Sequence, residues 1–193
     1  MEYNPDEKNS LKSQRLILRP WRISDLPDFA RLNADVEVMK YFPACLSERE
    51  SNAVAERINK LILKHGWGFW ALHCINDDRF IGFTGLHQPS GALPFSPCIE
   101  IGWRLDRQYW GKGLATEAAR CALQFAFGEL ALDQVVSFTA VANHRSQAVM
   151  QRLGMKRDAE NFFHPDLPPG HPLSEHVLYR LDAAEFRPVS DSS

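Results

Sequence analysis

The sequence predicts an α/β fold built on one mixed sheet. Two aromatic and β-branched runs, at residues 67–75 and 79–88, are separated by a turn signal and predict a hairpin. Residues 98–154 alternate strand, helix, strand and helix patterns, which is typical of an α/β unit. Residues 155–163 and 175–182 then predict two closing strands. We therefore expect antiparallel strands on both sides of a central parallel pair.

The length and apolar content favour one compact domain. The chain has 193 residues, of which 45% are hydrophobic. That is enough for one core and too little for two independent domains. We expect a single domain over residues 13–183. Residues 1–12 and 184–193 lack apolar periodicity, so we expect them to be flexible tails.

The first predicted strand is followed by a short helix. Residues 15–21 alternate in strand fashion, with their leucines on one face. Ser24 is the expected N-cap of a helix over residues 24–35, where apolar residues recur at helical spacing. The apolar segment 36–42 is a candidate for another helix.

Three longer helices are predicted. Ser47 and Glu50 form a capping box that opens a helix ending before Gly66. Residues 114–127 are rich in Ala, Leu, Glu and Gln, and residues 144–154 form a helical pattern closed by a glycine.

Charge and hydropathy narrow the class of partner. The formal net charge is -2 and 24% of residues are charged, so the overall charge favours neither nucleic acid nor an anionic membrane as a partner. The N-terminal residues lack a basic region leading into an apolar one, and no apolar run approaches membrane-spanning length. We expect a cytoplasmic protein.

Cysteines and histidines give no metal-site pattern. The cysteines lack the paired spacing of a zinc site or a redox dithiol, so we expect buried, reduced thiols and no metal. Three histidines in the proline-rich segment 164–176 also match no common zinc spacing. These residues are Cys45, Cys74, Cys98 and Cys121, and His164, His171 and His176.

The most informative segment is EIGWRLDRQYWGKGLATE, at residues 100–117. A strand pattern passes through WGKG directly into an alanine-rich helix. A helix N-terminus presents unpaired N–H groups and partial positive charge, and Gly111 and Gly113 leave it open to a phosphate. Lys112 adds a positive charge, and Ala115 keeps the first turn small. The spacing matches neither a P-loop nor a dinucleotide fingerprint.

A second motif supports a binding role for this turn. A lone GxG sequence more often makes only a tight turn with a helix cap. Downstream, however, Asn143 stands where the strand pattern of residues 134–142 gives way to a helix, and Ser146 follows three residues later. Asn143 by itself is an ordinary N-cap.

Together, EIGW, QYWGKGLATEA and NxxSxxVMQRLGM resemble the GNAT superfamily of acetyltransferases. In that superfamily a Q/R-x-x-G-x-G/A turn binds the pyrophosphate of acetyl-CoA. The resemblance spans about residues 15 to 182 and is strongest to the branch that contains the ribosomal-protein N-terminal alanine acetyltransferases. It implies a GNAT-type fold, with six to seven strands, about four helices and splayed central parallel strands.

The resemblance also assigns residues to acetyl-CoA. Trp110 stands in the Gln/Arg position of the motif, which is a departure from it, Gly113 is the first required glycine and Ala115 is the second small residue. Many members carry a tyrosine as general acid seven residues after the asparagine, where this chain has Met150. The expected CoA-binding residues are Trp103, Leu105, Trp110, Gly111, Lys112, Gly113, Leu114, Ala115, Thr116 and Asn143.

Acetyl transfer needs an oxyanion donor, an acid and a base. The resemblance implies a backbone N–H near Leu105 as the oxyanion donor and Ser146 as the proton donor, although a helix-surface serine is often only solvated. Glu100 is our first choice for the base, since strand alternation puts it with Arg104 on the side expected to face the cleft. A structural ion pair between Glu100 and Arg104 is an equal alternative.

Other side chains are lesser candidates near the site. His73 and His87 lie on the two hairpin strands and are secondary choices for the base. Trp67, Phe69, Trp70 and residues 41–43 give aromatic surface near the expected amine entrance, most of which we assign to the core.

We therefore expect an N-acetyltransferase that moves an acetyl group from acetyl-CoA to a primary amine by direct attack. A covalent route needs an activated thiolate, and no cysteine has a histidine-rich local context. The acceptor is a protein N-terminus or a small amine, and the protein is a monomer or homodimer. The alternatives are a non-catalytic acyl-CoA-binding regulatory domain, favoured by Met150, and a nucleotide-binding protein.

Overall fold

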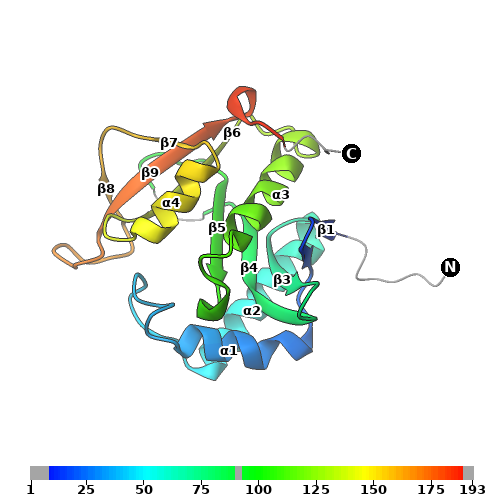
Figure 1. Cartoon of the computed structure of the whole chain (residues 1–193). Helices are drawn as coiled ribbons and strands as arrows, with labels where there is room; N and C mark the ends of the chain where they lie inside the picture. The colour runs from blue at the N-terminus through cyan, green and yellow to red at the C-terminus, as the bar shows by residue number, and fades with distance from the viewer. Residues whose placement is uncertain (1–8, 90–92, 189–193) are drawn as a thin grey trace.

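The structure is a computed structural model that describes residues 9–89 and 93–188 (Figure 1). In these residues one nine-stranded sheet has the order β1-β2-β3-β4-β5-β6-β9-β7, with β8 paired to β9. The strands are β1 Leu11–Lys12, β2 Leu16–Arg19, β3 Phe69–Cys74, β4 Arg79–His87, β5 Glu100–Leu105, β6 Gln134–Ala140, β7 Lys156–Arg157, β8 Phe162–Phe163 and β9 Glu175–Asp182. The helices are α1 Leu26–Ala34, α2 Glu48–His65, α3 Leu114–Gly128 and α4 His144–Arg152.

The sheet confirms the predicted mixed α/β architecture. β5 and β6 are parallel, whereas β1 to β5 pair in antiparallel fashion and β9 is antiparallel to β6. Six of the nine described strands have four or more residues, and β1, β7 and β8 have two each. The predicted closing strand at 155–163 is therefore two short strands, separated by a bend.

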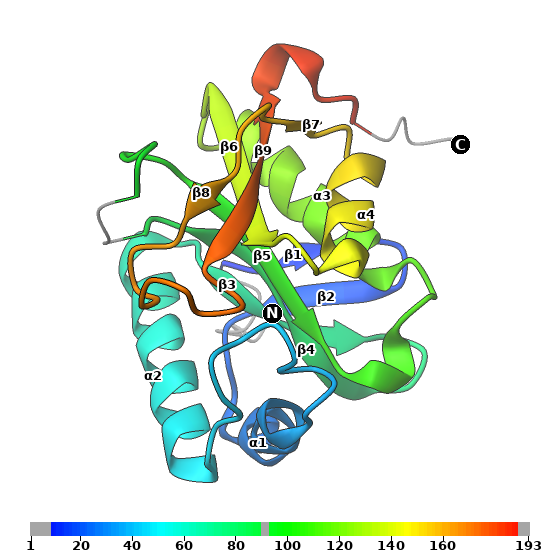
Figure 2. The ribbon, with the colours of Figure 1, turned by 90° about the vertical axis from the view of Figure 1, so that its left-hand side faces the viewer.

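The helices cover both faces of the sheet. On one face α1 packs through Phe29 against Phe83 of β4, with ring centroids 5.9 Å apart. On the opposite face Phe125 of α3 lies edge-on to Trp70 of β3, at 5.6 Å. Asn33 of α1 joins α2, and Figures 1 and 2 show α4 beside α3.

Local signals explain where the helices begin and end. The capping box of Ser47 and Glu50 forms as predicted, and α2 ends at His65, with Gly66 as its C-cap at a positive φ of 82°. The predicted N-cap at Ser24 is wrong, because residues 23–25 form a 3₁₀ turn and α1 begins at Leu26. Asp25 of that turn is buried in an ion pair with Arg19.

Residues 36–42 do not form the helix that their apolar pattern suggested. Asp35 leaves α1 in an extended conformation, and its carboxylate accepts hydrogen bonds from the N–H groups of Glu37 and Val38. These bonds make a local turn that competes with a helix, and Pro43 follows at once. The segment is a loop of turns that reaches the cavity described below.

Both ends of the predicted domain extend further than expected. β1 begins at Leu11 and pairs with β2, so structure starts before residue 13. At the other end, Phe186 packs against Phe127 of α3, with ring centroids 5.2 Å apart. The expected burial of all four cysteines is also wrong, because Cys45 is exposed and only Cys74 is buried.

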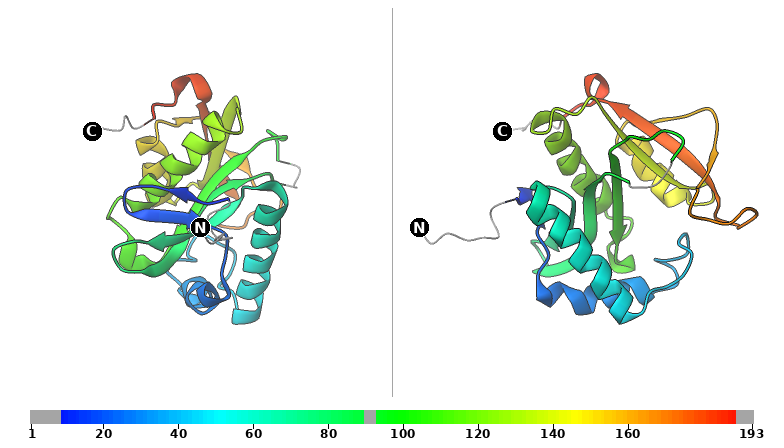
Figure 3. Two further views of the ribbon diagram at one scale, coloured as in Figure 1. Left: turned by 90° about the vertical axis from the view of Figure 1, so that its right-hand side faces the viewer. Right: turned by 180° about the vertical axis from the view of Figure 1, so that it is seen from behind.

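β1 and β2 lie beside α3, as Figure 3 shows, and one carboxylate fixes this contact. Oε1 of Glu117 accepts from the backbone N–H of Arg15 and from the hydroxyl of Ser13, both at 2.8 Å. Oε2 accepts from Nε of Arg15 at 2.7 Å. The beginning of the chain is thereby joined to the first turn of α3.

The central parallel strands separate as the resemblance implied. β5 and β6 are in register at one residue pair, Glu100 with Val136. One residue further along, the carbonyl of Ile101 accepts from the side chain of Ser137, at 2.9 Å, instead of from the backbone of β6. The sheet opens beyond this point, between its two halves.

Candidate functional site

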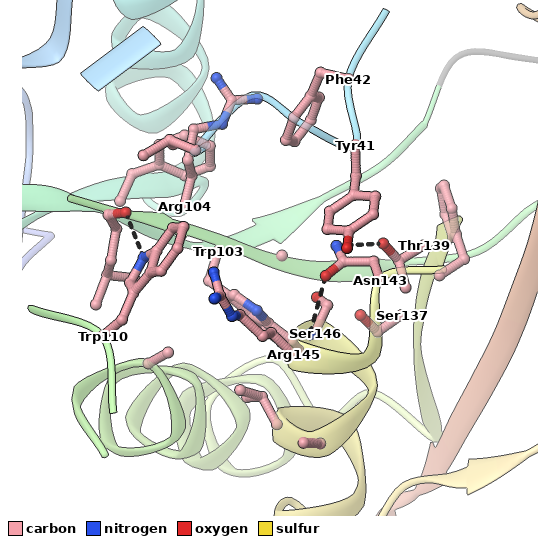
Figure 4. Close-up of a pocket in the computed structure, with 18 of the residues that line it drawn as sticks. Tyr41, Phe42, Trp103, Arg104, Trp110, Ser137, Thr139, Asn143, Arg145 and Ser146 are labelled. Carbon is pink, nitrogen blue, oxygen red and sulfur yellow. Dashed lines mark hydrogen bonds between the residues drawn. The ribbon is translucent and has the colours of Figure 1, made fainter. Parts of the chain in front are cut away.

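A cavity of about 1080 Å³ occupies the opening between β5 and β6. Its walls come from both strands, from the N-terminal turns of α3 and α4, and from the loop after α1 (Figure 4). All but one of the predicted site residues line it, namely Glu100, Trp103, Leu105, Trp110, Gly111, Gly113, Leu114, Ala115, Thr116, Asn143 and Ser146.

The N-terminus of α3 forms an open cradle on this cavity. Gly113 is its N-cap and has a φ of 77°, and no side chain caps the helix. A Cβ at Gly111 would meet nothing within 4 Å, and one at Gly113 would meet Nη2 of Arg15 at 3.6 Å. Because the first N–H groups of a helix have no intrahelical acceptor, they remain available to an anion here.

Lys112 is the exception among the predicted residues. It does not line the cavity, and its ammonium lies 5.1 Å from the centre of the Tyr109 ring. The cation beside the cradle that does line the cavity is Arg145 of α4, whose guanidinium lies 4.5 Å from the centre of the Trp110 ring. A cation in the first turn of a helix opposes the helix dipole, and this feature of the sequence could have identified Arg145.

Trp110 holds the turn between β5 and α3. Its indole N–H donates to the carbonyl of Leu105, at 2.9 Å (Figure 4). This bond fixes the end of β5 relative to the cradle. Trp110, which stands where the motif has Gln or Arg, therefore makes a structural hydrogen bond.

The open edge of β5 presents backbone groups to the cavity. The N–H of Asp106 donates to Ile81, which sets the phase of the β4–β5 ladder. In an antiparallel pair, alternate residues direct their backbone groups to opposite sides. The N–H groups of Trp103 and Leu105 are thereby directed away from β4, toward the gap where β6 has separated.

The start of α4 lies at the opposite wall. The side-chain oxygen of Asn143 caps the helix by accepting from the N–H of Ser146, at 3.3 Å, and its amide nitrogen donates to Thr139 at 2.9 Å. Figure 4 shows Tyr41, from the loop after α1, with its hydroxyl directed toward this group. Met150 is buried in the core and does not line the cavity.

Glu100 faces the cavity at the end of the parallel pairing. The residue is half-buried and lines the cavity. Burial raises the pKa of Glu100 from 4.5 to about 8. The alternative ion pair with Arg104 does not form, since Arg104 instead donates to Asn33 at 2.6 Å.

Four of the histidines named above separate into two groups. His73 is paired with Asp78, and His87 is stacked on Phe69, and neither lines the cavity. His164 and His176 do line it, with ring centroids 5.1 Å apart. Among the described residues, no group of three or more His, Cys, Asp or Glu side chains is placed to hold a metal ion.

The aromatic segment at 41–43 lines the cavity together with Phe69, whereas Trp67 and Trp70 do not. Sequence reasoning missed Ser137 and the surroundings of Arg104, because each depends on contacts between distant segments, and it missed Arg145 despite its place in the first turn of α4. In the described part of the chain, none of the helices has the length and apolar character needed to cross a membrane.

A mixed sheet that opens between parallel strands, with a glycine turn at the opening, is a GNAT-type acetyltransferase fold. The chain matches the acetyltransferase (GNAT) domain over residues 15–156, and it belongs to this family.

A curated protein shows the same relationship, and two solved structures share the fold. The chain is 30% identical over 185 residues to the FsC-acetyl coenzyme A-N(2)-transacetylase of Aspergillus fumigatus, covering 92% of this chain and 77% of that protein. A GNAT-family acetyltransferase from Bacillus anthracis superposes with a TM-score of 0.76 at 24% identity, covering 91% and 99% of the two chains. RimL, a ribosomal L7/L12 alpha-N-protein acetyltransferase in complex with coenzyme A, gives 0.71 at 17%, covering 90% and 97%. These two structures confirm the fold.

Proposed function

We propose that the protein is an N-acetyltransferase that uses acetyl-CoA and a primary amine. The observation that carries this proposal is one cavity that joins an uncapped helix N-terminus, an unpaired strand edge and a carboxyl with a raised pKa. The fungal relative is named for acetyl coenzyme A and for transfer to a nitrogen, which supports the same donor and acceptor types. RimL was solved with coenzyme A.

The residues fit the parts of acetyl-CoA. The cradle at Gly111 and Gly113 would hold the pyrophosphate, with Arg145 as the added cation. The pantetheine arm would lie along β5, where the backbone groups of Trp103 and Leu105 are directed into the gap. Acetyl-CoA supplies the activated acetyl group.

The proposed reaction is one displacement. Glu100 accepts a proton from the ammonium form of the acceptor, and the neutral amine attacks the thioester carbonyl carbon. The N–H near Leu105 stabilises the oxyanion while the new C–N bond forms. The carbonyl then re-forms as the C–S bond breaks, the nitrogen gives up its second proton, and the thiolate gains one. The products are an amide and CoA, and the proton held by Glu100 returns to solvent. Ser146 and Tyr41 are the candidate proton donors, because both line the cavity beside Asn143.

The first test measures thermal stability with acetyl-CoA, CoA, ATP and NAD, followed by thiol release from acetyl-CoA with a panel of amines and N-terminal peptides. We expect stabilisation by acetyl-CoA and CoA and amine-dependent thiol release, since a ligand that binds only the native state raises its stability. Stabilisation without thiol release would favour the non-catalytic acyl-CoA-binding alternative. Stabilisation by ATP or NAD alone would contradict the proposal.

A further inference from the structure

Arg104 is a cation of the cavity wall that has no acidic partner among the residues that the structure describes. Its guanidinium lies 4.0 Å from the centre of the Phe42 ring and 5.3 Å from that of Phe83. Its hydrogen bond to Asn33, through Nη1 at 2.6 Å, is the only one it makes among the described residues, and Nε is buried without an acceptor. A buried charge with unpaired donors is costly unless a ligand completes its partners.

Nearby carboxylates do not neutralise this charge. Glu37, Glu100 and Asp166 line the same cavity, and none of them forms an ion pair with Arg104 within 4.0 Å. Asp106, the acid nearest in sequence, is paired with Arg31 at 2.7 Å. Burial lowers the pKa of Arg104 to about 10, so the guanidinium remains positively charged at neutral pH.

The side chain of Arg104 is held in place by the first two helices. The amide nitrogen of Asn33 donates to the hydroxyl of Ser51 at 2.8 Å, and both residues are fully buried. This bond fixes which side of the amide faces Arg104, so the oxygen is presented to the guanidinium. The two aromatic rings lie against the guanidinium, and Nη2 has no hydrogen-bond partner among the described residues. Figure 4 shows Arg104 and Phe42 at the far side of the cavity from α4.

We propose that the amine acceptor carries a carboxylate, which Arg104 binds. The proposal rests on the proposed function and specifies the acceptor. A carboxylate accepts short, strong hydrogen bonds from a guanidinium, and Nη2 of Arg104 is the donor that the other contacts leave for it. Asn33 and Ser51 are positioning residues in this arrangement, since they act through Arg104.

The spacing of Glu100 and Arg104 along β5 determines how long the acceptor is expected to be. Glu100 and Arg104 lie on the same face of β5, four residues apart, which corresponds to roughly 13 Å along a strand. If the amine approaches Glu100, the carboxylate must lie several bonds away from it. The matching chemistry is an elongated amino carboxylate, either a free small molecule or a peptide N-terminus with an acidic side chain nearby.

The test compares acceptors that differ only in charge. ω-Amino acids of increasing length are assayed beside their ω-amino amides, and N-terminal peptides with Glu are assayed beside the same peptides with Gln. We expect kcat/KM for thiol release to favour the acid over the amide on the order of ten- to a hundredfold, the range of a charged hydrogen bond. The two arms distinguish a small molecule from a peptide. Equal use of acid and amide in both arms overturns the inference, while thiol release with any amine still supports the proposed function.

Two variants assign the preference to Arg104. R104Q removes the charge and is expected to bring the ratio of acid to amide close to one, mainly through KM for the acid. R104K keeps the charge without the planar fork, so part of the preference remains. R31Q is the matched control, because Arg31 is already paired with Asp28 and Asp106 and does not line the cavity. A preference that survives in R104Q overturns the assignment.

A binding measurement tests the same site without turnover. Calorimetry on the CoA-saturated protein compares N-acetylated ω-amino acids with their amides and with the corresponding phosphonates. We expect the wild type to bind the carboxylate more tightly than the amide and R104Q to bind both equally. Equal binding by the wild type contradicts the carboxylate site even if the protein is an active enzyme. Carboxylate binding without thiol release with any amine would instead leave the site intact and contradict the proposed function.

Discussion

Glu100 is the residue whose titration should govern the rate. As a base it must be ionised, and its pKa of about 8 makes kcat/KM rise with pH until it is deprotonated. The variant E100Q should lower kcat/KM by roughly 10²- to 10⁴-fold, the range of general acid–base catalysis, and should lose this rise. Thiol release measured across pH checks both effects. A profile that E100Q leaves unchanged would assign the base to another residue.

The same carboxyl also predicts a change in stability with pH. Folding raises the pKa of Glu100 from 4.5 to about 8, so the folded protein holds this proton more tightly than the unfolded chain does. The stability it contributes is present in full below the unfolded pKa and is lost as pH rises through about 8. The melting temperature of E100Q relative to wild type should therefore be higher at about pH 9 than at about pH 5. A constant difference would contradict the raised pKa.

The departing thiolate has two candidate proton donors, from different segments. Met150 is buried and does not line the cavity, whereas Ser146 and Tyr41 both line it. The true donor should cost about 10²- to 10⁴-fold in kcat when its hydroxyl is removed, with little change in CoA affinity. Rapid-mixing thiol release with S146A and Y41F distinguishes them. Near wild-type rates in both would mean that water supplies the proton.

At the scale of elements, we expect a substitution in the turn before α3 to weaken CoA binding. A matched substitution elsewhere separates this effect from the backbone strain that alanine causes at a positive φ. Gly113 and Gly154 have φ values of 77° and 84°, at the start of α3 and just after α4. Alanine at either should cost about 1–2 kcal/mol of stability, because a Cβ disfavours this conformation. G113A alters the cradle and should also weaken CoA binding more than tenfold. G154A is the control and should not, since its site has open space and lies outside the cavity.

Elements with a strong local cause were predictable from the sequence. The capping box at Ser47 and the left-handed Gly66 fix the ends of α2 by contacts within a few residues. The segment after α1 was not predictable from its apolar pattern, because the side chain of Asp35 takes the N–H groups that would begin a helix. Competition between side chains and the backbone for hydrogen bonds determines the structure of short segments, and the spacing of hydrophobic residues does not reveal it.

At the scale of the molecule, the opening of the sheet predicts which amides a ligand protects. The N–H groups of Trp103 and Leu105 face the gap, whereas that of Arg104 faces β4, where Arg104 is in register with Phe83. Acyl-CoA should slow hydrogen exchange at Trp103 and Leu105 in particular, because an amide exchanges slowly once it is hydrogen-bonded. Exchange measured by NMR with and without the ligand checks this. Equal protection at all three amides would indicate general stiffening instead.

Some site residues are likewise positioned by contacts close in sequence, and others by contacts between distant segments. The glycine turn and Asn143 were recognisable because each motif lies within one strand-to-helix junction. The stacking of Arg104 between Phe42 and Phe83 brings together three segments that are distant in sequence. Lys112 shows the converse, since its charge is close to the turn in sequence while its side chain lies over Tyr109.

The contact between Glu117 and the first strands has a consequence for the order of assembly during synthesis. Arg15 emerges from the ribosome long before its partner, which is 102 residues further along the chain. Domains form as the chain is made, from the N-terminus onward. The early half must therefore depend on its own hairpins until α3 arrives. When Glu117 docks, one event both fastens the start of the chain and completes the turn at the cavity.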